Sequence, residues 1–259
     1  MKIAITGKGG VGKSTFAGLL CRMFAAQEDR VLAIDADPDS NLASALGCPT
    51  EISSKIKPIS QLKNLIKERM EINIEKSFFK LNPKVDDLLE KYSYQCFENL
   101  RLVVMGEVKK GGSGCYCPEN NFLKNFFSHL LIEQKNHIIM DMEAGIEHLS
   151  RGTAYFVDAI IIVVEPGKHS LQTAKSIIGL SKDLGINKIF IVGNKILNDT
   201  QKKMIYSNFI NYPVILGLMS YDQDIILYEE NEKSLFESNL PIVSEVALIK
   251  HHLEREIAQ

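Results

Sequence analysis

The stretch that decides the fold is Gly7-Lys8-Gly9-Gly10-Val11-Gly12-Lys13-Ser14-Thr15. It follows the β-branched run from Lys2 to Thr6 and precedes a helical pattern from Ser14 to Ala26. The stretch therefore satisfies the pattern of a phosphate-binding loop, GxxxxGK followed by Ser or Thr, between a strand and a helix. The alternative is an ordinary glycine-rich turn, but the flanking strand and helix favour a nucleotide-binding loop.

Each residue type in this loop has a physical role. Glycines let the backbone curl around a phosphate without Cβ clashes, and the following helix presents its positive N-terminus. We expect Lys13 to reach the β- and γ-oxygens and the Ser14 hydroxyl to be a Mg²⁺ ligand. The residues expected to bind the nucleotide are Gly9, Gly10, Val11, Gly12, Lys13, Ser14 and Thr15.

Outward from the loop, short apolar runs alternate with longer amphipathic segments, as in a doubly wound, mostly parallel α/β sheet flanked by helices. The predicted strands are Lys2 to Thr6, Val31 to Ile34, Leu102 to Met105, His137 to Met140, Ala159 to Val164 and Lys188 to Val192. The predicted helices are Ser14 to Ala26, Asn120 to Gln134, Gln172 to Leu184, Asp199 to Ile210 and a closing helix from Ser244 to Gln259.

The length of 259 residues, without internal repeats, predicts a single P-loop domain over 1–259. The segment from about 49 to 100 interrupts the alternation, is rich in Lys and Glu, and carries helical rather than strand patterns. We therefore expect a helical insertion on the same domain.

Composition and charge exclude several classes of function. Thirty Lys and Arg residues against 32 Asp and Glu residues give a net charge of -2, which argues against a general attraction to nucleic acid or acidic membranes. The chain begins without the apolar stretch of a signal peptide, and its apolar runs are far shorter than the roughly 20 residues that span a bilayer. Five sparse cysteines, with Cys48 and Cys96 unpaired, fit reduced thiols. The sequence predicts a cytoplasmic protein without nucleic-acid or membrane partners.

Lys8 makes the loop a KGGVGKS variant, which resembles the deviant Walker A loop of the family that contains MinD, ParA, the arsenite-pump ATPase and nitrogenase iron protein. The resemblance implies a homodimer in which Lys8 reaches across a twofold interface to the partner's nucleotide. There it neutralises charge that develops during phosphoryl transfer. The other interpretation is that Lys8 contacts only the phosphates of its own chain.

Carboxylates follow the predicted strands, at the edge where open α/β sheets bind ligands. By resemblance to the family's DxDPxxN segment, Asp37 is expected to orient the attacking water, and Asp35 to lie nearer Mg²⁺. Asp141 is expected to be the Walker B carboxylate that holds the Mg²⁺ shell. The alternative for any aspartate here is that it caps a helix, and this alternative weighs most for Asp35 and Asp39.

Val192-Gly193-Asn194-Lys195 ends a predicted strand as a base-recognition segment does, so that Asn194 can pair with a purine edge. A guanine site of the NKxD type needs a carboxylate three residues after the asparagine, and Leu197 stands there. The sequence therefore predicts ATP or ADP rather than a guanine nucleotide. The alternative is that Asn194 caps a loop, with its side chain on the backbone.

The segment 111–118, Gly-Gly-Ser-Gly-Cys-Tyr-Cys-Pro, places Cys115 and Cys117 in a flexible turn. Thiolates at this spacing can converge on one soft metal ion, but two ligands are too few for a closed site. A twofold axis would bring four thiolates together and create a site for Ni²⁺ or Zn²⁺ that depends on the dimer. The alternatives are a redox-sensing pair or two bystander thiols.

Longer stretches, GGSGCYCPENNFLK over 111–124 and DMEAGIEHLSRGTA over 141–154, resemble the CooC proteins, the ATPases that mature nickel carbon monoxide dehydrogenase. The resemblance implies that Cys115 and Cys117 of each protomer hold one Ni²⁺ at the dimer interface. ATP binding and hydrolysis would then drive nickel into the dehydrogenase. A relative that loads acetyl-CoA synthase or another metalloenzyme would carry the same motifs, and a nickel store whose dimer state is set by nucleotide is a further alternative.

Other activities of the wider family need features that this sequence does not offer. A membrane positioner like MinD needs a C-terminal amphipathic helix with a basic face, whereas Lys250 to Glu256 mixes both signs. A DNA-segregating protein like ParA needs a surplus of Lys and Arg. A nitrogenase-type iron protein needs a cysteine close after Asp141, and Met142 to Gly145 contains none.

Overall fold

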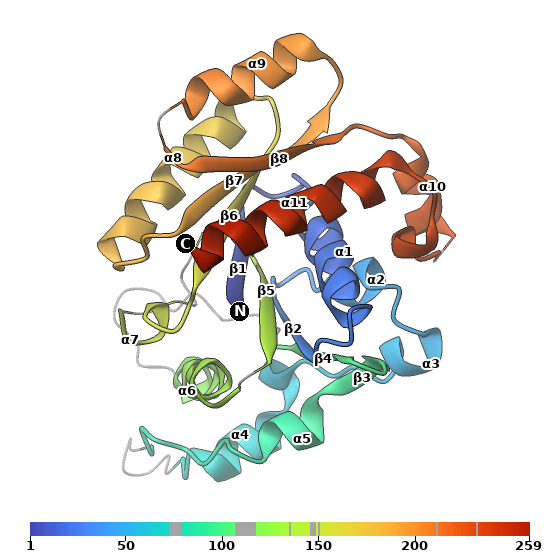
Figure 1. Cartoon of the computed structure of the whole chain (residues 1–259). Helices are drawn as coiled ribbons and strands as arrows, with labels where there is room; N and C mark the ends of the chain where they lie inside the picture. The colour runs from blue at the N-terminus through green and yellow to red at the C-terminus, as the bar shows by residue number, and fades with distance from the viewer. Residues whose placement is uncertain are drawn as a thin grey trace.

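The computed structural model describes residues 1–72, 79–106, 118–134, 136–145, 149, 151–210, 212–231 and 233–259. These residues form an eight-stranded sheet with the strand order β3-β4-β2-β5-β1-β6-β7-β8 (Figure 1). The strands are β1 (Lys2–Thr6), β2 (Val31–Ala36), β3 (Tyr94–Phe97), β4 (Leu100–Val104), β5 (His137–Met142), β6 (Ala159–Val164), β7 (Ile189–Ile196) and β8 (Val214–Ser220). All neighbours pair in parallel except β3, which is antiparallel to β4.

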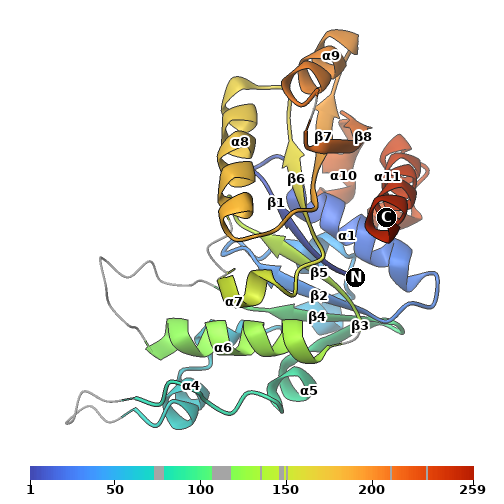
Figure 2. The same ribbon diagram turned by 60° about the vertical axis from the view of Figure 1, so that its left-hand side comes forward.

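Helices cover both faces of this sheet, and the doubly wound α/β prediction is confirmed. In Figure 2, α1 and α11 lie on one side and α6 and α8 on the other. The α-helices are α1 (Lys13–Ala25), α2 (Leu42–Ala45), α3 (Thr50–Ser53), α4 (Lys63–Arg69), α5 (Leu88–Tyr92), α6 (Pro118–Glu133), α7 (Arg151–Ala154), α8 (Lys168–Asp183), α9 (Asp199–Asn208), α10 (Asp224–Glu230) and α11 (Pro241–Ala258). Two short 3₁₀ helices are η1 (Ile59–Gln61) and η2 (Leu235–Glu237).

The two layers of helices bury two separate apolar cores against the sheet. Phe16 and Leu20 of α1 pack with Val246 of α11 on one face, whereas Phe122 and Phe126 of α6 pack on the other. Because each strand alternates its side chains between the faces, a strand buried on both sides must be apolar throughout. This is why β6 reads Ala-Ile-Ile-Ile-Val-Val and is buried at every position.

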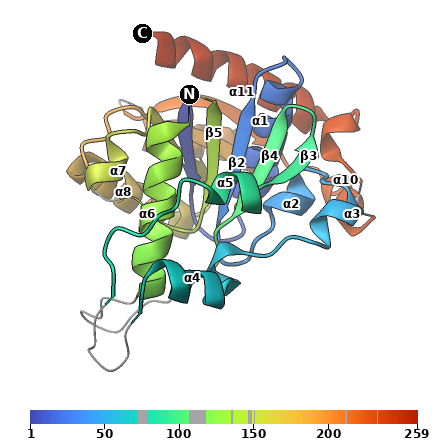
Figure 3. The same ribbon diagram turned by 90° about the horizontal axis from the view of Figure 1, so that it is seen from below.

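The segment 49–100 is helical only in part. It contributes α3, η1, α4 and α5, but it also supplies β3 at the sheet edge, which the helical prediction missed. Figures 2 and 3 both show α4 lying beside α6. Gln95 and Phe97 pair with β4 on either side of a register shift. An edge strand of only four residues with a bulge shows little alternation of polar and apolar residues by which the sequence could reveal it.

Three strands continue beyond the apolar runs that predicted them. β2 extends to Ala36, β5 to Met142 and β7 to Ile196. The parallel ladder continues because Asp35 pairs in register with Asp141 and Ala36 with Met142. Backbone hydrogen bonding does not require apolar side chains, so the polar residues that follow each run remain part of the sheet.

The prediction of reduced, unpaired thiols is wrong for two of the cysteines. Cys48, after α2, and Cys96, on β3, form a disulfide, with their Cα atoms 5.0 Å apart. The two residues are separated by 48 positions in sequence, and only the packing of the 49–100 segment against the sheet edge brings them together. Cys21 is a free thiol buried in α1, and burial raises its pKa far above the ordinary value.

Reduction of this disulfide should lower the free energy of unfolding by about 2–4 kcal/mol, because a cross-link restricts the unfolded chain. Chemical denaturation with and without dithiothreitol measures the effect. The Cys48→Ser/Cys96→Ser variant is the control and should not respond to the reductant. Identical unfolding midpoints for the wild type in both buffers would contradict the prediction.

Candidate functional site: a nucleotide pocket at the carboxyl ends of the strands

The glycine-rich loop lies between β1 and α1, where it forms one wall of a pocket of about 730 Å³. Helix α1 begins at Lys13 behind a left-handed Gly12 (φ 90°), and no described side chain caps it. The positive end of the helix dipole is therefore directed at the pocket, where it favours an anion. The loop residues that line the pocket are Gly9, Gly10, Gly12, Lys13, Ser14 and Thr15. Val11 differs from them, since its side chain is buried and its N–H donates to the Lys8 carbonyl at 3.4 Å.

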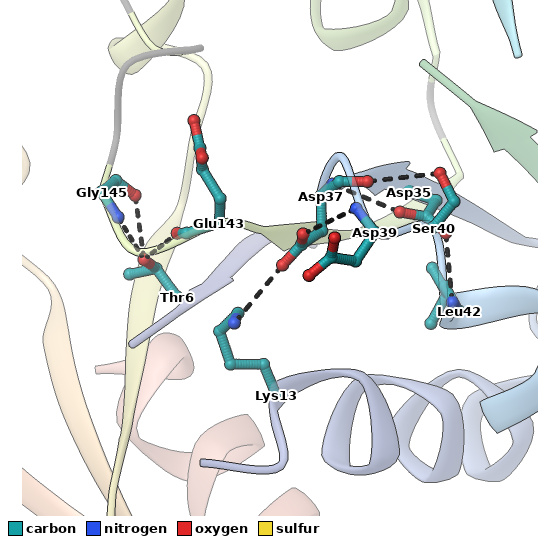
Figure 4. Close-up of polar contacts among 9 residues, drawn as sticks. All are labelled: Thr6, Lys13, Asp35, Asp37, Asp39, Ser40, Leu42, Glu143 and Gly145. Atoms are coloured by element: carbon teal, nitrogen blue, oxygen red, sulfur yellow. Dashed lines mark hydrogen bonds and ion pairs between the residues drawn. The ribbon is translucent and has the colours of Figure 1, made fainter. Parts of the chain in front are cut away.

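Lys13 and Asp37 form the charged centre of the pocket. The Lys13 side chain is only 6% exposed, and its Nζ lies 3.4 Å from Asp37 Oδ2, as Figure 4 shows. The other Asp37 oxygen accepts a hydrogen bond from the Asp39 N–H at 3.1 Å. The sequence prediction placed both residues at the γ-phosphate, and the fold brings them together from different strand ends.

Asp35 has a structural position distinct from that of Asp37. It is fully buried, and its two oxygens accept hydrogen bonds from the N–H groups of Asp37 (3.2 Å) and Leu42 (3.1 Å). Burial and the neighbouring charge of Asp141 raise the pKa of Asp35 to about 7, against the opposing effect of those amides. Asp35 therefore shapes the 37–42 turn, which corresponds to the capping alternative.

Asp141 is the penultimate residue of β5, pairs in register with Asp35 and is also fully buried. Burial raises its pKa to about 6, while Ser14 and Lys13 favour the ionised form. Neither carboxylate oxygen has a hydrogen-bond partner of good geometry among the described residues. A buried, unsatisfied carboxylate near a serine hydroxyl suits Mg²⁺, which takes oxygen ligands, so Ser14 and Asp141 fit the cation that P-loop ATPases use.

Thr6 connects the loop region to the segment after β5. Its hydroxyl lies 2.8 Å from the Glu143 carbonyl and 2.9 Å from the Gly145 carbonyl, and it accepts from the Gly145 N–H at 3.3 Å (Figure 4). The position of the chain after the Walker B strand is thus fixed from β1. The sequence analysis did not identify Thr6, because a polar residue closing an apolar strand gives no distinctive signal.

Lys8 is partly exposed, at 42%, and its Nζ lies 3.5 Å from Glu165 Oε1 of the same chain. Glu165 directly follows β6, and Lys195 Nζ approaches its other oxygen at 3.9 Å. The sequence analysis missed Glu165, although the search for carboxylates at strand ends that found Asp37 and Asp141 applies equally to it.

Asn194 lies in β7 and lines the pocket, as does Lys195. The Asn194 side chain pairs with backbone groups: its Nδ2 donates to the Val11 carbonyl at 2.8 Å, and its Oδ1 accepts from the Lys195 N–H at 2.8 Å. This is the arrangement expected of the loop-cap alternative. Tyr221 and Asp222, which follow β8, also line the pocket. β8 is the edge strand on one side of β1, whereas β2, which precedes Asp37, lies on the other side of β1.

Cys115 and Cys117, the predicted metal ligands, lie outside the described residues. Within the described ranges no group of three or more His, Cys, Asp or Glu side chains is arranged to hold a metal ion. The helices in those ranges also include none long and apolar enough to cross a membrane.

A phosphate-binding loop, a buried lysine and carboxylates at the ends of neighbouring parallel strands define a P-loop nucleotide hydrolase. The model of the CobQ/CobB/MinD/ParA nucleotide binding domain family matches residues 2–235. The chain belongs to this family, in which it is an ATPase of the CooC type.

The similar proteins agree with this assignment. The carbon monoxide dehydrogenase accessory protein CooC of Rhodospirillum rubrum is 45% identical over 228 residues, which cover 87% of this chain and 85% of that protein. An uncharacterised ATP-binding protein of Methanocaldococcus jannaschii is 41% identical, covering 88% of each chain. The solved structure of the MinD cell division protein of Aquifex aeolicus shares the fold, with a TM-score of 0.69 at 18% identity and 98% coverage of both chains.

The raised pKa of Asp35 predicts a pH dependence of stability in buffer without Mg²⁺ or nucleotide. Between the ordinary carboxyl pKa of 3.8 and about 7, the folded state binds more protons at Asp35 than the unfolded state. The free energy of unfolding should therefore fall as the pH rises through this window. Asp35→Asn should flatten the fall, whatever it does to the absolute stability.

Urea denaturation at several pH values measures this slope. Asp39→Asn, which removes an exposed carboxylate from the same loop, is the matched control and should keep the wild-type slope. An unchanged slope in Asp35→Asn would contradict the assignment of the proton to this site.

Proposed function

We propose that the protein is a homodimeric ATPase that binds Ni²⁺ as cargo and delivers it to the active-site cluster of carbon monoxide dehydrogenase. The observation that carries the proposal is the convergence of Lys13, Asp37 and Asp141 on the glycine-rich loop, in a chain 45% identical to a carbon monoxide dehydrogenase accessory protein. ATP hydrolysis supplies a switch between two states of the dimer, and that switch controls retention and release of the metal.

In the hydrolysis step, the loop amides and Lys13 bind the β- and γ-phosphates, and Asp37 orients a water molecule toward the γ-phosphorus. Water oxygen bonds to that phosphorus as the bond to the β–γ bridging oxygen breaks, giving ADP and inorganic phosphate. Mg²⁺ held by Ser14 and Asp141 would neutralise phosphate charge. The ion pair of Asp37 with Lys13, at 3.4 Å, supports a carboxylate at the γ-phosphate end of the pocket.

Lys8 acts on the nucleotide of the partner protomer. In this chain it is paired with Glu165 at 3.5 Å, both side chains being partly exposed. Such pairs contribute about 1 kcal/mol or less, so the several negative charges of a partner's ATP can draw Lys8 away. Dimerisation thereby becomes a condition for hydrolysis.

The cargo site is formed by Cys115 and Cys117 from both protomers. Four thiolates suit Ni²⁺ and equally Zn²⁺, and cellular availability then decides which ion is bound. Since neither protomer alone supplies enough ligands, the affinity for metal depends on the closure of the dimer. Nucleotide state then gates metal transfer to the dehydrogenase.

Lys8→Ala should retain ATP binding and lose turnover by about a thousandfold, the scale of a charge supplied in trans. Phosphate release measures turnover, calorimetry measures ATP binding, and light scattering measures mass with ATP present. Lys203→Ala, at an exposed position on α9, is the control. Wild-type turnover in Lys8→Ala would contradict the trans role.

Equilibrium dialysis of the reduced protein with Ni²⁺ or Zn²⁺, with and without ADP or ATP, tests the cargo site. We expect one metal ion per dimer, lost in Cys115→Ala/Cys117→Ala. Metal binding that persists in the double variant, or a dimer that binds none, would remove this site and leave an ATPase switch without metal transfer.

A further inference from the structure

We infer that Asn194 and Lys195 are positioning residues that set the shape of the phosphate-binding loop. Both lie at the carboxyl end of β7. Lys195 Nζ donates to the Gly10 carbonyl at 2.6 Å, and Asn194 Nδ2 donates to the Val11 carbonyl at 2.8 Å. Two consecutive carbonyls of the loop are therefore held by two consecutive residues of one strand.

These contacts matter because the loop has little stiffness of its own. Gly10 and Gly12 adopt φ values of 78° and 90°, a region in which glycine rotates at low energetic cost. In a trans peptide the carbonyl and the next N–H point in opposite directions. Holding the Val11 carbonyl toward β7 thus turns the Gly12 N–H away from β7, and holding the Gly10 carbonyl fixes the Val11 N–H.

The holding pair is itself ordered. Asn194 is only 6% exposed, and its Oδ1 accepts the Lys195 N–H at 2.8 Å. Lys195 adopts a left-handed backbone (φ 57°), which is uncommon for a residue with a side chain and indicates a constraint from its surroundings. Gly12 packs so closely on Asn194 that a Cβ there would lie 2.3 Å from Asn194 Nδ2. The loop and β7 therefore fit one another only with glycine at this position.

Glu165 extends the arrangement across the loop. Its oxygens lie 3.9 Å from Lys195 Nζ and 3.5 Å from Lys8 Nζ. Lys195 is thus placed between a backbone carbonyl and a carboxylate, and its charge is directed at the loop. The consequence is a role in binding the phosphates that is independent of which base the nucleotide carries.

This inference deepens the ATPase function and requires that the phosphates of ATP occupy this loop. Loss of ATP binding in Lys13→Ala tests that requirement separately. If Lys13→Ala binds ATP like the wild type, the nucleotide site is elsewhere. If Lys13→Ala loses ATP binding, the phosphates occupy this loop, and the experiment on Lys195 then tests the positioning role separately.

The experiment measures the dissociation constants of Mg-ATP and Mg-tripolyphosphate, which has no base or ribose, for the wild type and Lys195→Met. Loss of a charge-assisted hydrogen bond should weaken both by about tenfold or more and by the same factor. Lys195→Arg, which keeps a cationic donor, should restore most of the affinity for both ligands. Lys203→Met, at an exposed lysine on α9, should bind both like the wild type.

Two results would overturn the inference: an unchanged affinity of Lys195→Met for tripolyphosphate beside a weakened affinity for ATP, or no change for either ligand. Asn194→Ala gives a second, independent test if Lys195→Met does not fold. A positioning role predicts a weakened affinity of Asn194→Ala for tripolyphosphate, whereas base recognition alone predicts the wild-type affinity for that ligand.

Discussion

The close seating of the glycine-rich loop against the ends of β6 and β7 is the constraint on which the rest of the site depends. A Cβ at Gly7 would lie 2.3 Å from the Val163 carbonyl, and a Cβ at Gly12 would lie 2.3 Å from the Asn194 side chain. Contacts this short exclude any side chain at either position. The loop is therefore fixed to the sheet at two points, and the first turn of α1 is aimed from there at the pocket.

The position of the loop determines where the charged side chains of the site meet. Lys13 is buried where it meets Asp37, and neither carboxylate oxygen of Asp141 has a hydrogen-bond partner of good geometry among the described residues. Asp35 pairs in register with Asp141, and its two oxygens accept hydrogen bonds from backbone amides. The pKa of Asp35 is raised to about 7, chiefly because the carboxyl group is buried. Two aspartates at equivalent heights in neighbouring strands thus have different roles, one in shaping a turn and one suited to a cation.

Contacts between segments far apart in sequence hold the region around the pocket together. Thr6 joins the end of β1 to Glu143 and Gly145, and the Cys48–Cys96 disulfide joins the pocket wall after α2 to the edge strand β3. The pocket is consequently enclosed by segments that are far apart in sequence. A ligand that fills the pocket would contact several of these segments at once.

The sequence by itself determined the doubly wound fold, the loop and the neighbourhood of Lys13, Asp37 and Asp141, because strand-end position and glycine spacing are local properties. Only the tertiary structure decided that Asp35 supports a turn, that Asn194 contacts the loop backbone, and that Cys48 meets Cys96. It also revealed Glu165 and Lys195 as neighbours. Those outcomes depend on which strands lie side by side and on packing between distant segments, and neither is encoded in a local pattern.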